Sequence, residues 1–197
     1  MKYFSLDEIE ETVDEKPSTS GIHVEKFLQL HVEKISSVKQ LTGRLPADGE
    51  AYFLWTVNSF NAFTFIPLII REHGVIDELI LATYSINIRI IDALVRLIDK
   101  KLIHQVDIFI SDSIKTRLPK VYDHLMALVE QKPVRVFYSW THAKIALIRS
   151  GDFFYDVEGS GNWGENAQHE QYVFANSKRV FEFRKKEIIH GINAVAV

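Results

Sequence analysis

Apolar positions from about residue 50 onward alternate between short continuous runs and longer amphipathic stretches. The short runs predict buried strands at residues 51–57, 78–84, 105–110 and 134–138. The longer stretches predict helices over residues 60–72, 88–101 and 116–130. Strands that alternate with helices in this way favour a parallel sheet with both faces covered.

The pattern changes after Trp140. Residues 142–149, 153–158 and 171–175 predict three strands with little helix between them, and residues 177–190 predict a closing helix. The expected fold class is therefore α/β, with a mixed, mainly parallel β-sheet flanked by helices on both faces.

The first 45 residues differ from the rest of the chain. They begin with an acidic stretch and a Pro-Ser-Thr-Ser-Gly breaker at 17–21, followed by two similar segments, residues 23–26 and 31–34. The apolar positions around these segments fit a helix as well as a strand. A turn signal at 45–49 then divides the chain into an N-terminal segment, 1–45, of no assigned role and a main domain, 46–197.

Composition narrows the possible functions. The chain has 197 residues, of which 47% are hydrophobic, enough for one core, and it has no cysteine, which excludes disulfides, thiolate metal sites and cysteine nucleophiles. Its net charge of −3 provides no general attraction for polyanions, so any phosphate site must be local. With no apolar run at the start and none long enough to cross a bilayer, we expect a cytoplasmic protein without stable membrane association.

The chemistry-bearing residues are concentrated in the last third of the chain. His142 and Lys144 are two apart on a predicted strand, and Ser160 and Asn162 have the same spacing after Gly159. Because side chains alternate along a strand, each pair is expected to share a face, and the two pairs could converge between neighbouring strands. An imidazole, an ammonium, a hydroxyl and an amide suit the binding and attack of a phosphate.

Together with Glu170, these residues resemble the signature of the phospholipase D superfamily, His-x-Lys followed by Gly-Ser-x-Asn. The resemblance covers some 145 residues from about residue 50. It implies a metal-independent phosphodiesterase that needs no cofactor, in which His142 attacks phosphorus to form a phosphohistidine. It also implies that Lys144 and Asn162 hold the phosphate oxygens, with Ser160 and Gly159 beside them, and that Glu170 orients a histidine.

Members of this family need two copies of the motif, and the sequence contains one. The resemblance therefore implies a homodimer that shares one active site, as in the family's small endonucleases, with nucleic acid as the substrate. A phospholipase or phosphatidyltransferase is the second expectation. The chain departs from the family pattern at Arg149, where an aspartate is usual.

Three other interpretations remain open at this point. Residues 159–164 match the dinucleotide fingerprint G-x-G-x-x-G, although the next predicted strand leaves no room for its helix. A Zn²⁺ or Mn²⁺ site could also form from five clustered side chains, those of His142, Asp152, Glu165, His169 and Glu170. Finally, the motif could be accidental, and the chain a catalytically silent binding module. Trp140 and Trp163 flank the motif, and they are either packing residues or platforms on which bases stack.

Overall fold

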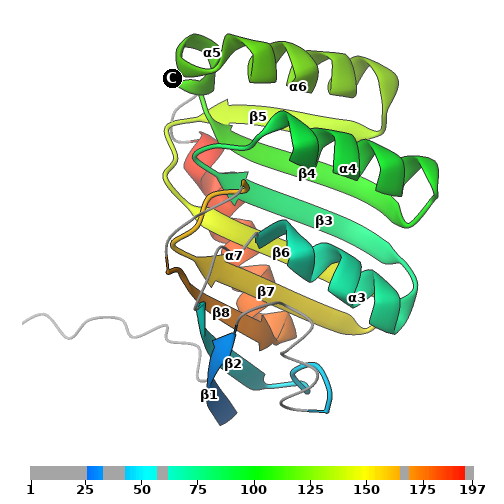
Figure 1. Ribbon diagram of the computed structural model, residues 1–197, viewed down its shortest axis with the longest axis vertical. Helices are drawn as coiled ribbons and strands as arrows, with labels where there is room; N and C mark the ends of the chain where they lie inside the picture. The colour runs from blue at the N-terminus through cyan, green and yellow to red at the C-terminus, as the bar shows by residue number, and fades with distance from the viewer. Residues whose placement is uncertain (1–25, 33–42, 57–61, 165–168, 194–197) are drawn as a thin grey trace, which may run out of the picture.

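The computed structural model describes residues 26–32, 43–56, 62–164 and 169–193, with the backbone alone for 26–32 and 192–193. These residues form one eight-stranded sheet with the strand order β1-β2-β8-β7-β6-β3-β4-β5 (Figure 1). The strands are β1 (Lys26–Val32), β2 (Glu50–Thr56), β3 (Ile76–Thr83), β4 (Ile103–Ser111), β5 (Val134–Ser139), β6 (Lys144–Ser150), β7 (Phe153–Gly159) and β8 (Gln171–Asn176).

The sheet is mixed, and most of its strands point the same way. Neighbours pair in parallel at β1–β2, β3–β4 and β4–β5, and the other four pairings are antiparallel. Only β6 and β8 run against the remaining six of the described strands. The expected fold class, a mixed and mainly parallel sheet flanked by helices, is confirmed.

Helices cover the two faces of the sheet unequally (Figure 1). One face carries η1 (Ala62–Thr64), α3 (Phe65–His73), α4 (Ile88–Asp99), α5 (Ile114–Arg117) and α6 (Pro119–Gln131). The other face carries α7 (Lys178–Asn193), which packs on β5, β6 and β7. Alternate residues of β3 therefore enter two cores: Leu81 joins the larger cluster, and Ile80 packs with Phe181 of α7 in the smaller one.

Three predicted elements need adjustment. The predicted helix over 116–130 is two helices, because Leu118 leaves the helical conformation and Pro119 starts α6, a position that suits its missing N–H. The region that fitted a helix or a strand equally well contains β1, and most of its remainder lies outside the described residues. β1 pairs with β2, so part of the predicted N-terminal segment belongs to the same sheet, and the boundary near residue 46 stays a prediction.

The strand β2 was expected to be buried, and the structure corrects this. Its side chains alternate, with Tyr52 and Leu54 in the larger core and Phe53 and Trp55 exposed by 43% and 48%. The exposed pair lies on the α7 side of the sheet, which α7 covers only as far as β7. The sheet therefore keeps an uncovered apolar strip over β2 and β8.

Candidate active site

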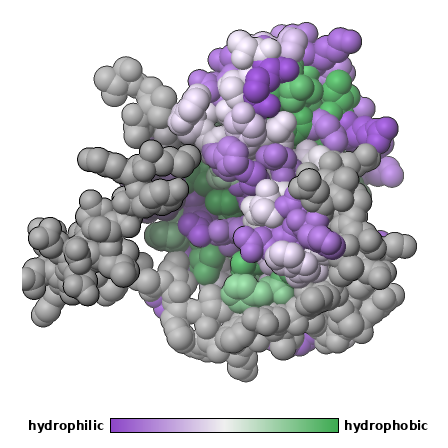
Figure 2. All heavy atoms as spheres, turned by 60° about the vertical axis from the view of Figure 1, so that its left-hand side comes forward, coloured by the Kyte–Doolittle hydropathy of each residue, from purple (hydrophilic) through white to green (hydrophobic). Residues whose placement is uncertain are grey.

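The motif residues meet at one edge of the sheet. Because β6 and β8 run against their neighbours, their first residues lie beside the last residues of β3, β7 and β2. Lys144 thus pairs with Thr83, and Gln171 pairs with Trp55. Figure 2 turns this edge toward the viewer: hydrophilic side chains predominate in its upper part, beside a hydrophobic patch at the right, and other hydrophobic ones lie in a recess below.

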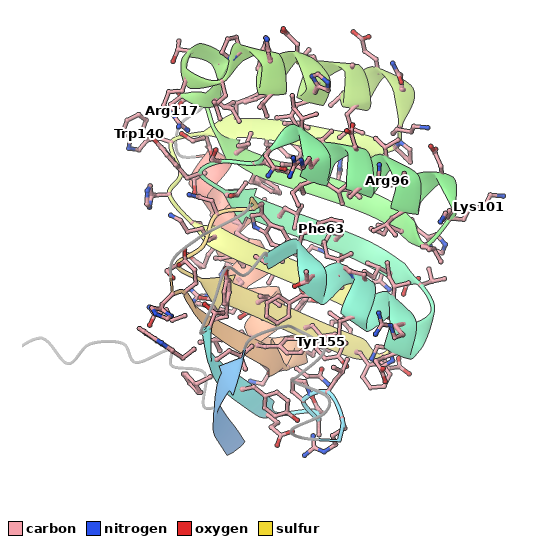
Figure 3. The ribbon with its side chains drawn as sticks, in the orientation of Figure 1. Phe63, Arg96, Lys101, Arg117, Trp140 and Tyr155 are labelled. Carbon is pink, nitrogen blue, oxygen red and sulfur yellow. The ribbon has the colours of Figure 1, made fainter. Side chains whose placement is uncertain are left out.

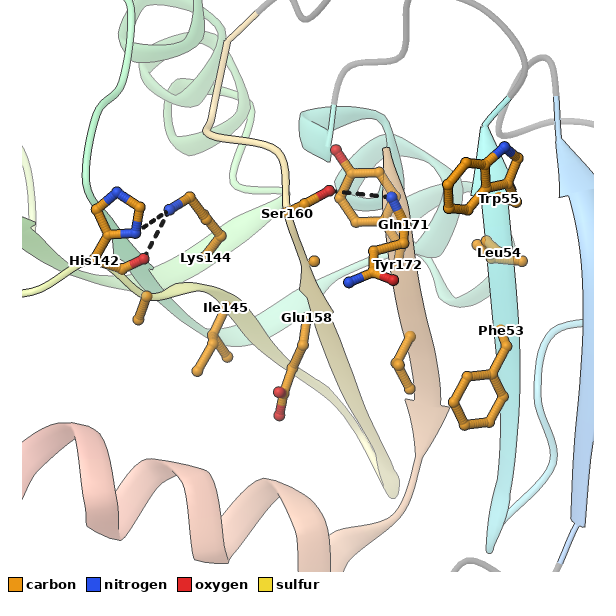
Figure 4. Close-up of a pocket in the computed structure, with 13 residues that line it drawn as sticks. Phe53, Leu54, Trp55, His142, Lys144, Ile145, Glu158, Ser160, Gln171 and Tyr172 are labelled. Atoms are coloured by element: carbon orange, nitrogen blue, oxygen red, sulfur yellow. Dashed lines mark hydrogen bonds between the residues drawn. The ribbon is translucent and has the colours of Figure 1, made fainter. Parts of the chain in front are cut away.

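His142 and Lys144 are in direct contact (Figure 4). The Lys144 Nζ lies 2.8 Å from Nδ1 of His142 and donates to the His142 carbonyl oxygen, also at 2.8 Å. The His142 ring is exposed and lies against Tyr84, with 4.8 Å between the ring centroids. His142 precedes β6 rather than belonging to it, so its position follows from the loop and not from the strand alternation that we expected.

The second pair also lies beyond its strand. β7 ends at Gly159, so Ser160 and Asn162 belong to the following loop, and strand period does not place them on one face. A Cβ at position 159 would lie 2.3 Å from the Tyr172 ring, and therefore only glycine fits there. Gly159 thus lets β7 approach β8 closely, and Ser160 follows at the groove described below.

Glu170 is fixed beside Ser160. The Ser160 hydroxyl donates to the Glu170 carboxylate and accepts from the Gln171 amide at 3.1 Å. The buried Thr56 hydroxyl accepts from the Glu170 amide at 2.7 Å, and the Thr56 amide donates to the Glu170 carbonyl at 2.9 Å. In the described chain, Glu170 therefore orients Ser160, whereas the resemblance implied that it orients a histidine.

The electrostatics of Lys144 depend on its burial. Partial desolvation lowers the pKa of its ammonium, and the negative charge of Glu170 partly opposes that shift. A lysine with a lowered pKa gives up a proton more readily than an exposed one. The Lys144 ammonium is therefore close enough to Glu170 to interact with its charge, although the atoms that it bonds belong to His142.

Asn162 occupies a different position from the other motif residues. It is half-buried in the loop after β7, where its carbonyl accepts from the Gly164 amide at 2.8 Å. The next residue, Trp163, is 1% exposed and bridges to Ile86 in the larger core. Asn162 does not line the groove that His142 and Lys144 enter, so its role in holding phosphate stays a prediction.

A groove of about 940 Å³ crosses this edge of the sheet (Figure 4). His142, Lys144, Gly159 and Ser160 line one part of it. The remaining lining residues are mostly apolar: Phe53, Leu54, Trp55, Ala143, Ile145, Glu158, Gln171, Tyr172 and Val173.

The aromatic end of this groove was not predicted from the sequence. Trp55 stacks on His169 with 6.2 Å between ring centroids, and Phe53 lies two residues away on the same face. The apolar run in β2 gives no signal for this exposure, because a strand buried on both faces reads the same.

The alternative sites find little support in the geometry. Among the described residues, no three side chains of His, Asp or Glu gather where they could hold a metal ion. Asp152 is exposed on a turn, His169 bonds the Thr56 carbonyl oxygen at 2.8 Å, and Glu165 lies outside the described residues. No helix begins within 160–164, which the dinucleotide fingerprint would require.

Arg149 stands at the far end of β6 from Lys144. Its guanidinium bonds Asp77 at 3.3 Å, and the same carboxylate accepts from the Gly151 amide at 2.8 Å. Arg149 therefore helps to secure the turn between β6 and β7. The arginine at the position where the family usually has an aspartate thus forms a charge pair with Asp77, and neither residue lines the groove.

Comparisons with known proteins agree with this architecture. No family model matches the sequence, and no curated protein does. A solved structure, the phospholipase D family member Nuc from Salmonella typhimurium, superposes with a TM-score of 0.50 at 15% identity, covering 66% of this chain and 87% of Nuc. Polyphosphate kinase from Porphyromonas gingivalis gives 0.54 at 18% identity, over 72% of this chain and 26% of the kinase.

The likeness to Nuc extends over most of that protein, and the likeness to the kinase spans about a quarter of it. At such low identities, the shared property is the arrangement of strands and helices. The chain has a phospholipase D-like fold, as the sequence resemblance implied.

Proposed function

We propose that this protein is a metal-independent phosphodiesterase, a nuclease, that acts through a phosphohistidine on His142. The observation that carries the proposal is the contact between His142 and Lys144 at the mouth of a large groove, on a phospholipase D-like fold. An imidazole beside an ammonium can attack phosphorus while the cation stabilises the negative charge on the phosphate oxygens.

The proposed reaction has two displacements. A nitrogen lone pair of the neutral His142 ring attacks phosphorus, the N–P bond forms, and the bond to the leaving oxygen breaks. Lys144 moves its donor from the imidazole to a phosphate oxygen, and Ser160, fixed by Glu170, offers a second polar group. Water then attacks phosphorus and gives a proton to the group that protonated the leaving oxygen, the N–P bond breaks, and the phosphomonoester leaves with the His142 ring restored.

The leaving oxygen needs a proton, and a second histidine is the simplest donor. Among the described residues that line the groove, His142 is the one histidine. We therefore propose that His142 of a second copy supplies the proton across a two-fold interface. Light scattering tests this arrangement. A dimer mass is expected, and a strictly monomeric active protein would contradict the shared site.

The chemical proposal is tested with a bis-aryl phosphodiester in the presence of EDTA. We expect the wild-type protein to release aryl alcohol, His142→Asn to be inactive, and Lys144→Gln to lose about 10²- to 10³-fold in kcat, the effect typical of removing one donor to developing charge. The matched control is His124→Asn, because His124 is an exposed histidine on α6. It should leave activity unchanged.

The phosphohistidine adduct, which is acid-labile, can be detected in an independent measurement. A diester labelled in its phosphoryl group should leave an adduct on His142 after a rapid acid-free quench, and His142→Asn should show none. Cleavage that disappears on chelation would favour a metal mechanism. An active His142→Asn variant would exclude the nucleophile proposed here.

One observation favours a second candidate, a phospholipase or phosphatidyltransferase. The part of the groove beyond Lys144 is apolar, with Phe53, Ile145 and Val173 along it, and such a wall could accept an acyl chain. In the described part of the chain, no helix has both the length and the apolar character to cross a bilayer. A comparison of polynucleotide and phospholipid vesicle cleavage separates the two candidates.

A further inference from the structure

Three connecting segments meet near His142 at the carboxyl ends of β3, β4 and β5, and the one after β4 contains α5. Tyr84 follows β3, residues 112–117 follow β4, and Trp140 follows β5. The loops after β4 and β5 are joined by the Asp112 amide, which donates to the Ser139 carbonyl at 3.1 Å. Figure 3 shows Arg117 and Trp140 together at this edge, with Lys101 at the opposite one.

Arg117 is held close to the proposed nucleophile. Its guanidinium carbon lies 4.2 Å from the centroid of the Tyr84 ring, and its Nε donates to the Ser113 hydroxyl at 3.2 Å. The same Tyr84 ring contacts His142. One aromatic ring thus links an exposed, oriented guanidinium to the imidazole. The Arg117 Nη2 also donates to the Tyr84 carbonyl at 3.4 Å, and a guanidinium has more N–H donors than these two bonds use.

Trp140 and Lys115 extend this surface. Trp140 is 82% exposed, the highest value among the exposed large apolar residues of the described chain. Lys115 lies with its Nζ 4.6 Å from the centroid of the Tyr138 ring, two residues before Trp140. The adjoining connections after β4 and β5 thus carry two cations and an exposed indole. Together they could provide stacking for a base and charge for its phosphates, the combination that binds single-stranded nucleic acid.

This edge presents exposed cations although the whole chain is net negative. The net charge is −3, yet the side chains of Lys115 and Arg117 are exposed here, and Lys144 begins β6 at the same edge. These cations offer a local site for phosphate, although the net charge gives no general attraction for polyanions. An indole that projects from the surface stacks on an unpaired base, because a duplex hides the faces of its bases.

We propose that Arg117, Lys115 and Trp140 bind the unpaired strand that flanks the scissile phosphate, with Arg117 on a neighbouring phosphate and Trp140 stacked on a base. This inference rests on the proposed function, since it places the flanking strand relative to His142. It specifies the substrate as single-stranded nucleic acid, or a duplex end that has opened.

Fluorescence anisotropy tests the proposal with labelled oligo-dT and oligo-U, on full-length protein carrying His142→Asn so that the strand stays intact. Trp140→Ala should weaken binding by at least about fivefold without changing the salt dependence. Arg117→Gln should weaken binding and lower the slope of log affinity against log salt by about 0.7. The two strands show whether the 2′-hydroxyl contributes.

Matched controls lie elsewhere on the surface. Arg96→Gln removes the same charge from an exposed position on α4, away from this edge (Figure 3), and Phe183→Ala removes an exposed aromatic ring from α7. Both should bind the oligonucleotides as the parent does. In an otherwise wild-type chain, Arg96→Gln and Phe183→Ala should also cleave the small bis-aryl diester at the normal rate.

The outcomes separate this inference from the proposed function. If the two edge variants bind oligonucleotide as the parent does while the diester is still cleaved, the strand site is wrong and the phosphodiesterase stands. If the parent binds neither oligonucleotide, or if the same variants lose binding to anionic phospholipid vesicles and keep oligonucleotide binding, the inference is overturned. If the parent binds the oligonucleotides and the edge variants do not, but the wild-type protein cleaves no diester, the proposed function is refuted and the strand site stands.

Discussion

The two halves of the sheet are built differently. In the parallel half, β3 and β4 have α3 and α4 on one face and Phe181 of α7 on the other. Their central residues are buried without interruption from Leu79 to Thr83 and from Val106 to Ser111. In the other half, β2 and β8 are covered on one face by α3 and its core, while Phe53, Trp55 and Gln171 remain exposed on the other. The groove lies in this second half.

The two halves of the sheet therefore have different roles. The parallel half positions the loops that hold Tyr84, Arg117 and Trp140, and its stability depends on close packing. The second half contains the groove, and its buried Asp156 lies near the like charge of Glu158, whereas the buried Asp107 of the parallel half is bonded to Arg135. Substitutions should therefore affect folding in the first half and binding or pH dependence in the second.

The largest effect is expected in the parallel half. Leu81→Ala removes a fully buried side chain from β3 and should lower the free energy of unfolding by about 2–5 kcal/mol, measured by urea denaturation. The comparison variant Val173→Ala removes methyl groups from the half-buried groove wall on β8. Equal losses from both variants would show that the groove wall is packed as tightly as the core.

An intermediate effect is expected at Asp156 on β7. Burial raises the pKa of its carboxyl, the neighbouring Glu158 raises it further, and Arg184 partly opposes the shift. Because the folded-state pKa is raised, the stability from the protonated group is complete below the ordinary carboxyl pKa and is lost as the pH rises through the raised value. Asp156→Asn imitates the protonated form and should raise the free energy of unfolding at neutral pH, by on the order of 1 kcal/mol.

The measurement is urea denaturation at several pH values between acidic and neutral conditions. The wild-type stability should fall relative to Asp156→Asn as the pH rises. Asp152→Asn is the control, because Asp152 is exposed on the turn between β6 and β7. Parallel pH profiles for wild type and Asp156→Asn would show that the carboxyl does not carry this dependence.

The smallest effect on stability is expected at Trp55. Its ring is half exposed and stacks on His169, so Trp55→Ala should change the free energy of unfolding by less than about 1 kcal/mol. The same denaturation assay measures this. A loss comparable with that of Leu81→Ala would mean that the strip over β2 and β8 is covered in solution, for example by a second copy of the chain.

Periodicity predicted the order and type of most elements. The run from Glu78 and the stretch from Ile88 correspond closely to β3 and α4, because helix and strand periods are local properties of the chain. Prediction failed at 116–130, where Pro119 is compatible with both a continuing and a newly starting helix. It also failed at β2, since an apolar run does not reveal whether both faces are covered.

The candidate site was predicted in part for a similar reason. The spacing of His142 and Lys144, together with the family resemblance, identified two residues that are in contact. Strand alternation predicted that Ser160 and Asn162 share one face, but β7 ends before them. No sequence motif includes Trp55, Arg117 or Trp140. They lie on segments far apart in the sequence, and only the folded sheet brings those segments to the same edge.

The sequence alone determined the residue chemistry, the alternation of strands and helices, and the glycine that β7 needs where it passes Tyr172. Only the tertiary structure decided that β6 and β8 reverse direction and that α7 stops short of β2. Those two features set which side chains share an edge and which remain exposed. They depend on contacts between residues far apart in the sequence, such as Thr83 with Lys144 and Thr56 with Glu170, which no local pattern encodes.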